Sequence, residues 1–381
     1  MLSLRGIPKL PDRLKLERRT FLGLALVSPY AVMSAVSAPT ESPDDLHDLL
    51  ASQRESNGLP AIAAGLMKQG RLLAVGAAGV RKAGTEVAVT RDDKFHIGSD
   101  TKAMTATLAA MLVGEGKLRW NQTLSELFPE RAAKMNADYR PVTLEMLLTH
   151  RAGMAHDGHD YGSKSDPVTV QRLKYLDATI NQAPAHKAGE FSYSNAGYIV
   201  VGAILERVTG KAWETLIRER LFKPLGMTSA GFGPPSKANM VDQPWGHVLA
   251  DGHYQARYGD NPPALGPAGT VHCSIADYLK FADFHASGGR RPAGLLAPEL
   301  VEKLRTPPPS ATYAMGWGTG KRGWAKGTVM THAGSNTMNY FIVWVAPKIE
   351  FSVAAAANAA GPAVSKDLDQ VVGKLVQRYA G

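Results

Sequence analysis

Ser99 is the starting point for a chemical interpretation of this sequence, because a lysine follows it three positions later. Ser99-Asp100-Thr101-Lys102 is the only Ser-x-x-Lys in the chain. In a helix, residues three apart share a face, so the two side chains would meet. The macrodipole of a helix N-terminus opposes a cation, and burial favours the neutral form of a lysine. Lys102 is therefore a candidate proton acceptor for a nucleophilic Ser99, and the backbone N–H of Ser99 is a candidate oxyanion donor.

The same four residues also fit an ordinary helix start, with Ser99 or Asp100 as N-cap and a solvated lysine. The stretch from Ala103 to Val113 contains no charged residue, which predicts a helix buried on every side. A charged residue at the start of a buried helix conflicts with its apolar surroundings. Such local conflicts are typical of functional sites.

A second candidate group is Tyr193-Ser194-Asn195, the only Tyr-x-Asn in the chain. A tyrosine beside Ser99 and Lys102 could relay the proton, as acceptor during acylation and as activator of water during deacylation. Asn195 could hold an amide group of a substrate and fix Lys102. The tripeptide equally fits a helix start, in which Ser194 or Asn195 is the cap and Tyr193 packs beneath it.

A third candidate group, His332-Ala333-Gly334-Ser335, ends a strand-like run. Gly334 would let a substrate lie against the strand edge, with backbone N–H groups exposed to it. The N–H of Ser335 could then complete an oxyanion hole with that of Ser99. His-x-Gly occurs twice more in the chain, so order and strand context are what select His332.

The elements that must position these groups are helices in the middle of the chain and strands near both ends. A hairpin is predicted from Ala61–Met67 and Leu72–Ala77, joined by Gln69-Gly70. Other predicted helices are 46–54, 144–148, 197–209, 213–221 and 365–379, and other predicted strands are 328–332, 340–345 and 351–356. This order predicts a mixed α/β (α+β) fold, one sheet interrupted by a helical insertion, with the active site between the two.

The ordered set Ser99-x-x-Lys102, Tyr193-x-Asn195 and His332-x-Gly334 resembles the serine β-lactamase and penicillin-binding-protein superfamily, in its class C-like branch. Esterases and D-amino-acid peptidases belong to the same branch. The likeness extends over about residues 46 to 379, with agreeing segments at 95–99, 147–154, 191–198, 224–227, 267–269 and 274–277. It implies a β-lactamase-like antiparallel sheet flanked by N- and C-terminal helices.

The resemblance also implies roles for the candidate residues. Ser99 would be the acyl-forming nucleophile, Lys102 and Tyr193 its proton-transfer partners, and Asn195 would support them. The backbone N–H groups of Ser99 and Ser335 would bind the oxyanion, and His332 and Gly334 would lie on the substrate-binding strand.

His332 stands where class C β-lactamases have the lysine of a Lys-Thr-Gly motif, which helps to hold the β-lactam carboxylate. Histidine is mostly neutral near pH 7 and is a weaker anchor for an anion. His-x-Gly resembles the esterase and D-peptidase branches more closely. Carboxylic esters are therefore the first expected substrates, D-amino-acid peptides the second and β-lactams the third.

Composition excludes several classes of protein. A chain of 381 residues with 44% hydrophobic and 20% charged residues is not disordered, collagen-like or a polytopic membrane protein. The net charge is +9. Residues 1–38 contain six basic and two acidic residues, so this segment carries +4 and the remainder carries +5. Without basic runs, this excess does not indicate nucleic-acid binding.

No metal or other cofactor is expected. The single cysteine, Cys273, excludes an internal disulfide and a multi-cysteine zinc site, and it is expected to be a small buried residue. One stretch is rich in potential metal ligands: His150, His156, Asp157, His159 and Asp160. A metal site is the sharper interpretation of this stretch, and a polar loop at the rim of the active site is the favoured one. Trp317 and Trp324 flank a glycine-rich stretch and fit a pocket wall or the core equally well.

The N-terminus is interpreted as an export signal. Residues 1–38 have a charged lead, an apolar run from Phe21 and small residues at its end, and the pair Arg18-Arg19 resembles a twin-arginine signal. The expected location is periplasmic or extracellular in a bacterium, with no stable membrane span after processing. Residues 39–45 would be a linker. The hydrolase domain would be 46–381, with a sheet part (46–98 and 291–381) and a helical part (99–290).

The leading hypothesis is a serine hydrolase that forms an acyl-enzyme on a small-molecule, peptide or cell-wall-like substrate. A hypothesis from another class is a non-catalytic receptor or interaction protein that has kept the fold. The intact set of Ser99, Lys102 and Tyr193 argues against it, because a binding protein has no need of a proton-transfer lysine. The oligomeric state cannot be inferred from the sequence.

Overall fold

The computed structural model describes residues 42–157 and 161–381, and its main element is a seven-stranded sheet. The strand order is β1-β3-β2-β12-β11-β10-β9. All neighbours in this sheet are antiparallel except β1 and β3. The strands are β1 (Asp44–Asp45), β2 (Ala61–Lys68), β3 (Arg71–Gly79), β9 (Gly318–Arg322), β10 (Gly327–Ser335), β11 (Tyr340–Ala346) and β12 (Phe351–Ala357).

Two smaller sheets accompany it. One has the order β4-β8-β5 and the other pairs β6 with β7. Their strands are β4 (Phe95–His96), β5 (Gly231–Phe232), β6 (Gly246–Ala250), β7 (His253–Arg257) and β8 (Val271–Cys273).

The helices fall between the early and the late strands, apart from one at each end of the fold. The helices are α1 (His47–Asn57), α2 (Thr101–Gly114), α3 (Leu124–Leu127), α4 (Leu144–Leu148), α5 (Val168–Ile180), α6 (Asn195–Thr209), α7 (Trp213–Ile217), α8 (Lys223–Leu225), α9 (Gly266–Gly269), α10 (Ile275–Ala286), α11 (Pro298–Arg305) and α12 (Pro362–Tyr379). The expected mixed α/β fold, with an antiparallel sheet flanked by N- and C-terminal helices, is confirmed.

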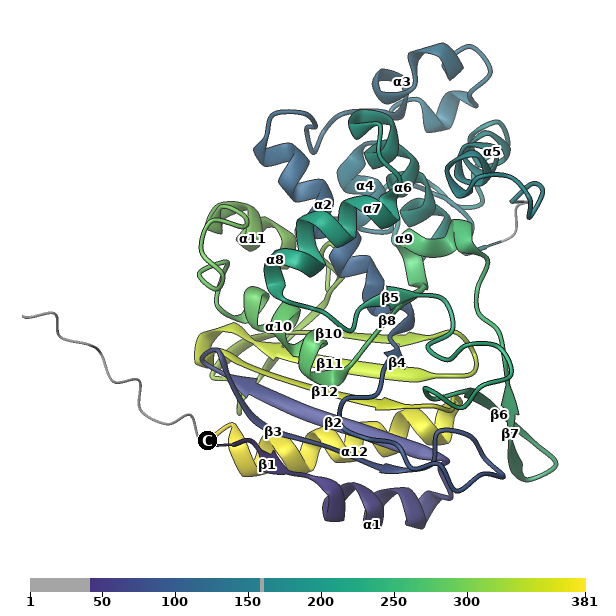
Figure 1. Ribbon diagram of the computed structural model, residues 1–381. Helices are drawn as coiled ribbons and strands as arrows, with labels where there is room; N and C mark the ends of the chain where they lie inside the picture. Colours follow the sequence, from purple (N-terminus) through teal and green to yellow (C-terminus); the bar gives the residue numbers. More distant parts are fainter. Residues whose placement is uncertain (1–41, 158–160) are drawn as a thin grey trace, which may run out of the picture. The chain divides into compact units, whose positions relative to one another are not determined.

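The central sheet has a hydrophobic layer on each face. On one face α1 and α12 cover the sheet (Figure 1), and Leu50, Val353 and Leu368 belong to the apolar cluster between them. On the other face α10 packs against β2, β11 and β12. Helix α10 comes from the range expected for the helical part, so the sheet layer also contains residues from the middle of the chain.

Local sequence signals explain several of these boundaries. The β2–β3 hairpin turns at Gln69 and Gly70, which both have positive φ, as a tight two-residue hairpin loop requires. Gly210 and Gly226 end α6 and α8 in the left-handed conformation. The predicted hairpin and these two helix ends are therefore confirmed.

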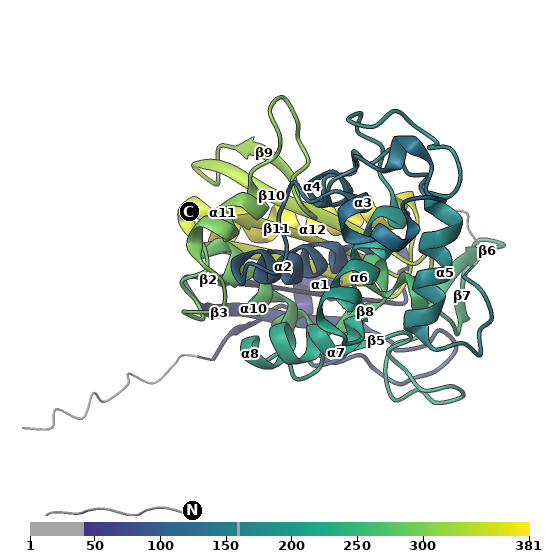
Figure 2. The same cartoon turned by 90° about the horizontal axis from the view of Figure 1, so that it is seen from above.

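Helix α2 lies at the centre of the helical side, in contact with α6, α9 and α11 (Figure 2). All its residues from Thr101 to Leu112 are buried, which confirms the helix predicted from the chargeless stretch. The predicted export signal, residues 1–38, lies outside the described residues. The last two residues of the expected linker, Asp44 and Asp45, form β1 beside β3.

Within the two described ranges, no helix combines the length and the apolar character needed to cross a membrane.

Candidate active site

Ser99 lies where a short 3-10 turn runs into a helix. The turn η1 (Gly98–Asp100) continues directly into α2, so Ser99 and Lys102 lie on one face. The Nζ atom of Lys102 is 3.0 Å from Oγ of Ser99. Asp100, the N-cap of α2, makes no side-chain capping bond, and Lys102 is fully buried. The alternative of an ordinary helix start with a solvated lysine is therefore wrong.

The amine of Lys102 lies among groups that accept hydrogen bonds. Besides Ser99, it donates to Oδ1 of Asn195 at 2.6 Å and to the carbonyl oxygen of Ala268 at 2.8 Å. Burial lowers the pKa of Lys102 to about 7, against the opposing effect of the Asp157 and Asp100 carboxylates. A neutral amine has two N–H groups and one lone pair. Oδ1 of Asn195 and the carbonyl oxygen of Ala268 can only accept, so they take the two N–H groups, and the lone pair faces the hydroxyl of Ser99.

Tyr193 also reaches the nucleophile. Its side chain interacts with that of Ser99, and its ring centroid lies 4.9 Å from Nζ of Lys102. Burial raises the pKa of Tyr193, although the interaction with Ser99 opposes this shift. Tyr193 is therefore a neutral phenol near pH 7, and Lys102 is the stronger proton acceptor of the two.

The start of α6 fits both interpretations of its tripeptide. Ser194 caps the helix, because its Oγ accepts a hydrogen bond from the backbone N–H of Gly197 at 3.1 Å. Asn195 is the first residue of the helix and still reaches Lys102. The cap places the neighbouring Tyr193 and Asn195 on the site.

Strand β10 and turn η1 touch backbone to backbone. A Cβ atom at Gly334 would lie 2.0 Å from the carbonyl oxygen of Ile97 and 2.6 Å from the amide nitrogen of Ser99. A Cβ at Gly98, where φ is +53°, would lie 2.3 Å from the amide nitrogen of Ser335. Only glycine permits this approach. It brings the backbones of Ser99 and Ser335 to the same cavity.

His332 lies on β10, on the same face as Gly334, but it is not among the described residues that line the cavity. Its Nε2 atom is 3.1 Å from the hydroxyl of Tyr313, and its Nδ1 atom is 4.0 Å from Oδ2 of Asp100. Neither Nδ1 nor that carboxylate oxygen has a hydrogen-bond partner, and both side chains are buried. Burial and, to a smaller extent, the nearby Lys102 lower the pKa of His332 to about 3. His332 is therefore neutral, and it contacts Tyr313 and approaches Asp100 instead of lining the cavity.

Asn195 joins Lys102 to a second carboxylate. Its Nδ2 donates to Oδ1 and Oδ2 of Asp157 at 3.0 and 3.2 Å. Nδ1 of His156 lies 2.6 Å from Oδ2 of Asp157, whose side chain is 45% exposed. The amide group of Asn195 is thus engaged on both sides within the protein.

These groups surround a cavity of about 440 Å³, which we call the Ser99 cavity. None of the described residues that line it is a lysine or an arginine. They are Ser99, His156, Asp157, Tyr161, Asn195, Asn261, Pro262, Leu265, Gly269, Ser335, Asn336 and Thr337.

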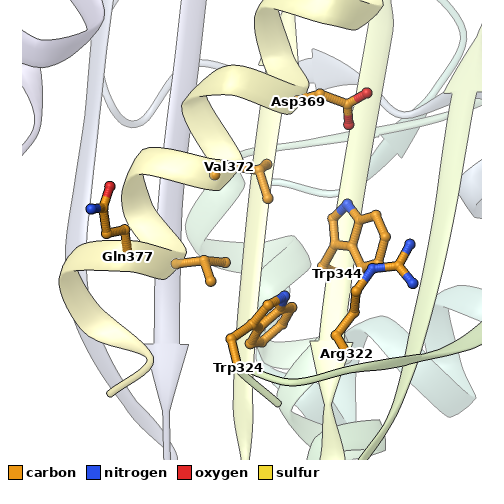
Figure 3. A pocket seen from close by; sticks show the side chains of 8 residues that line it. Arg322, Trp324, Trp344, Asp369, Val372 and Gln377 are labelled. Carbon is orange, nitrogen blue, oxygen red and sulfur yellow. The ribbon is translucent and has the colours of Figure 1, made fainter.

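A second cavity, of about 410 Å³, lies between the sheet and α12 (Figure 3). We call it the tryptophan groove, after Trp324 and Trp344. Its other lining residues are Arg322, Asp369, Val372, Gly373, Val376 and Gln377. Trp324 packs against Phe351 at the sheet, and Trp317 is buried in the core. Of the two tryptophans considered from the sequence, one therefore lines a pocket and the other does not.

His150, the first residue of the stretch rich in potential metal ligands, has a different structural role. His150 is buried among aromatic rings, with Tyr193 centred 4.2 Å away, and its Nδ1 accepts a hydrogen bond from the N–H of Ser194 at 3.1 Å. His159 and Asp160 lie outside the described residues. Within residues 42–157 and 161–381, no group of three or more potential ligands could hold a metal ion. Cys273 is free and buried, and burial raises its pKa.

Two residues beside the nucleophile were not recognised as part of the site from the sequence. Asp157 was grouped with potential metal ligands, and Asp100 was considered only as a helix cap. The sequence signal for Asp100 is the one that also indicates Lys102, namely a charged residue at the start of a buried helix. Nothing in the sequence pairs Asp157 with Asn195, because the loop path between them sets that contact.

Comparison with known proteins agrees with this geometry. A family model described as Beta-lactamase matches residues 46–377. Penicillin-binding protein 4 of Amycolatopsis lactamdurans is 31% identical over 265 residues, which cover 65% of this chain and 66% of that protein. Unguisins hydrolase ungD' of Aspergillus campestris is 29% identical over 261 residues, which cover 61% of this chain and 46% of that protein. The chain thus spans between about half and two thirds of the length of these curated relatives.

A solved structure, that of SurE, has a TM-score of 0.74 with this chain at 24% identity and covers 88% of this chain and 75% of its own. This likeness supports the fold. The family model spans most of the chain and includes Ser99, Lys102, Tyr193, Asn195, His332 and Gly334. The chain therefore belongs to the β-lactamase family.

Proposed function

We propose that this chain is a serine hydrolase that forms an acyl-enzyme on Ser99 and hydrolyses an ester or an amide. One observation carries the proposal: the buried amine of Lys102 lies 3.0 Å from Oγ of Ser99, while its other two contacts are obligatory acceptors. That arrangement leaves the lone pair of a neutral Lys102 facing the serine hydroxyl, as nucleophile activation requires.

Acylation would begin with transfer of the Ser99 hydroxyl proton to Lys102. Oγ of Ser99 then forms a bond to the substrate carbonyl carbon, and the carbonyl oxygen becomes an oxyanion held by the N–H groups of Ser99 and Ser335. When the bond to the leaving group breaks, Tyr193 donates its hydroxyl proton to the leaving atom. Lys102 returns the proton that it holds, so Tyr193 acts as a relay and needs no anionic form.

Deacylation would use the same groups in the reverse direction. A water molecule gives a proton, through Tyr193, to Lys102, and its oxygen attacks the acyl carbon. Oγ of Ser99 leaves and regains its proton from Lys102. Every step balances without a metal or a redox cofactor.

Carboxylic esters are the substrates that we propose first, ahead of D-amino-acid peptides and β-lactams. The support is the position of His332, which is neutral, buried and bonded to Tyr313. Among its described lining residues, the Ser99 cavity thus has no lysine or arginine to hold a β-lactam carboxylate. The names of the relatives include both a penicillin-binding protein and a hydrolase, so both alternatives enter the test.

The test is hydrolysis of a short-chain p-nitrophenyl ester and of a chromogenic cephalosporin, each by the wild type and by Ser99→Ala. We expect ester turnover that falls by about 10³-fold or more in Ser99→Ala, to the level of residual binding effects. Ester turnover retained by Ser99→Ala would refute the acyl-enzyme. Efficient cephalosporin turnover would reverse the order of substrates.

The alternative of a non-catalytic binding protein is separated by covalent labelling. A phosphonate ester probe should attach to Ser99 and be located by peptide mass spectrometry. Failure to label, together with no turnover of either substrate, would favour the binding protein.

We further propose that residues 1–38 direct export, with the folded domain placed in the periplasm or outside a bacterial cell. The charged lead, the apolar run and Arg18-Arg19 support this proposal. Double substitution of Arg18 and Arg19 by lysine should retain the protein in the cytoplasm, as fractionation of the producing cells would reveal. Unchanged export would contradict the twin-arginine route.

A further inference from the structure

The charge that faces the substrate in the Ser99 cavity is negative. Asp157 lines the cavity with 45% of its side chain exposed, and no described lining residue is a lysine or an arginine. Lys102 is not one of the lining residues. It is fully buried and forms hydrogen bonds with three protein groups. Among the described lining residues, a substrate therefore meets the Asp157 carboxylate, with the His156 ring against it, and no lysine or arginine.

The carboxylate of Asp157 is held in place and still has room for a donor. A carboxylate offers about four acceptor positions. Asn195 donates to both oxygens, and His156 lies against Oδ2. Among the described residues, these contacts account for three of the four positions and leave one on Oδ1.

Asp157 is also close to the chemistry. Asn195 donates to Asp157 with Nδ2 and accepts from Lys102 with Oδ1, and Lys102 bonds to Ser99. Two side chains therefore separate the carboxylate from the nucleophile. Asp157 and Ser99 line the same cavity, so one small substrate can contact both.

We propose that Asp157 determines specificity by binding an ammonium group on the acyl part of the substrate, so that the preferred substrates are esters or amides of amino acids with a free amine. This inference rests on the proposed serine hydrolase function. A charge-assisted hydrogen bond from an ammonium group to a fixed carboxylate is among the stronger polar contacts available to a small substrate. The same carboxylate repels a substrate that carries its own carboxylate at that position.

Binding at Asp157 would also assist the chemistry. The Asp157 carboxylate raises the pKa of Lys102 against the effect of burial. A bound ammonium group offsets that negative charge and so favours neutral Lys102. Removal of the charge by Asp157→Asn should therefore move the acid limb of the pH profile for a neutral ester to lower pH, which a merely structural role would not do.

The experiment compares the p-nitrophenyl esters of alanine (both enantiomers) and of propionic acid, which differ only in the amino group. At pH 6.5, where an α-amino group carries its proton, the wild type should prefer the better alanine ester by about tenfold or more in kcat/KM. Asp157→Asn keeps the shape of the side chain and should reduce that preference about tenfold. Glu190→Gln removes the same charge from an exposed residue that does not line the cavity, and its preference should equal that of the wild type.

Each outcome has one meaning. Equal turnover of the two esters by the wild type, or an equal change of both in Asp157→Asn, would overturn the role of Asp157 while the hydrolase function stands. Absence of Ser99-dependent turnover on both esters would instead overturn the hydrolase function. A preference lost in Glu190→Gln as well would assign the effect to net charge and would also overturn the proposal.

Discussion

The Ser99 cavity and the tryptophan groove have similar volumes, about 440 and 410 Å³, but they differ in how they are built. The Ser99 cavity is formed by residues from η1, α6, β10 and the loops between them. The tryptophan groove is formed by α12 and the neighbouring strands β9 and β11, together with Trp324. The first therefore joins distant parts of the chain, and the second lies between a helix and the sheet that it covers.

The two cavities also treat their charges differently. At the Ser99 cavity, Lys102 and Asp100 are fully buried, so their pKa values are shifted in opposite directions by burial. At the tryptophan groove, Arg322 is exposed and lies over the ring of Trp344 at 5.0 Å (Figure 3). Buried charges cost stability and persist where they serve a function. The two cavities therefore cannot be distinguished by their volumes. They are distinguished by the free-energy cost of burying charged side chains, which is high only at the Ser99 cavity.

The largest effect is expected from loss of the Lys102 amine. Lys102→Met should lower kcat/KM for an ester by about 10³-fold, because no neighbouring group replaces the proton acceptor. The control is Lys174→Met, which removes an exposed amine that pairs with Asp166, and should leave turnover within about twofold. Steady-state kinetics checks both. A loss of less than about tenfold in Lys102→Met would place the base elsewhere.

Gly334→Ala should lower kcat by about 10²-fold. The added Cβ meets the carbonyl oxygen of Ile97 and the amide nitrogen of Ser99, so β10 must move away from η1 and the two oxyanion N–H groups separate. Gly323→Ala is the matched control beside the tryptophan groove, because a Cβ there meets nothing within 4 Å. Full activity in both variants would show that the contact between β10 and η1 is irrelevant to turnover.

The pH profile of kcat/KM should show a moderate fall, and only on its acid side. Lys102 must be neutral to accept a proton, and its pKa is lowered to about 7. Below that value kcat/KM should fall about tenfold per pH unit, and above it a plateau should follow. The measurement is kcat/KM for a neutral ester from pH 5 to 9 at constant ionic strength, corrected for spontaneous hydrolysis. A flat profile down to pH 5 would be inconsistent with Lys102 as the base.

The smallest effect on activity is expected at the tryptophan groove. Trp344→Ala removes a half-buried ring from the sheet surface, so the free energy of unfolding should fall by about 2 kcal/mol while kcat/KM changes less than about twofold. Denaturant unfolding and ester kinetics check the two values. A tenfold loss of activity in this folded variant would mean that the groove is coupled to the site, and the contrast between the cavities would fail.

The parts predictable from the sequence are those that depend on local patterns. The chargeless stretch after Lys102 predicts a buried helix, and Gln69-Gly70 predicts a hairpin turn, because both signals lie within the element that they describe. The meeting of Ser99 and Lys102 follows from helical spacing alone. The family resemblance was inferred from the order of the three motifs along the chain, because each motif alone is too short to identify a family.

The parts that could not be predicted depend on which distant side chains meet. Asp157 and Asn195 are joined by a loop whose path no periodicity describes. The partners of His332 could not be predicted either, since it contacts Tyr313 and lies near Asp100. A strand pattern gives the face on which a residue lies, but not the partner that a neighbouring segment presents to it.

The close contact between Gly98 and Ser335 has a consequence for the order of folding. Turn η1 lies in the first third of the chain and β10 near its end, so nearly the whole chain must be made before the two can meet. Closing so long a loop is entropically costly, and such contacts form late. During synthesis the nucleophile and its lysine can therefore be in place while the oxyanion site is still missing, and the protein acquires its full activity only with the final strands.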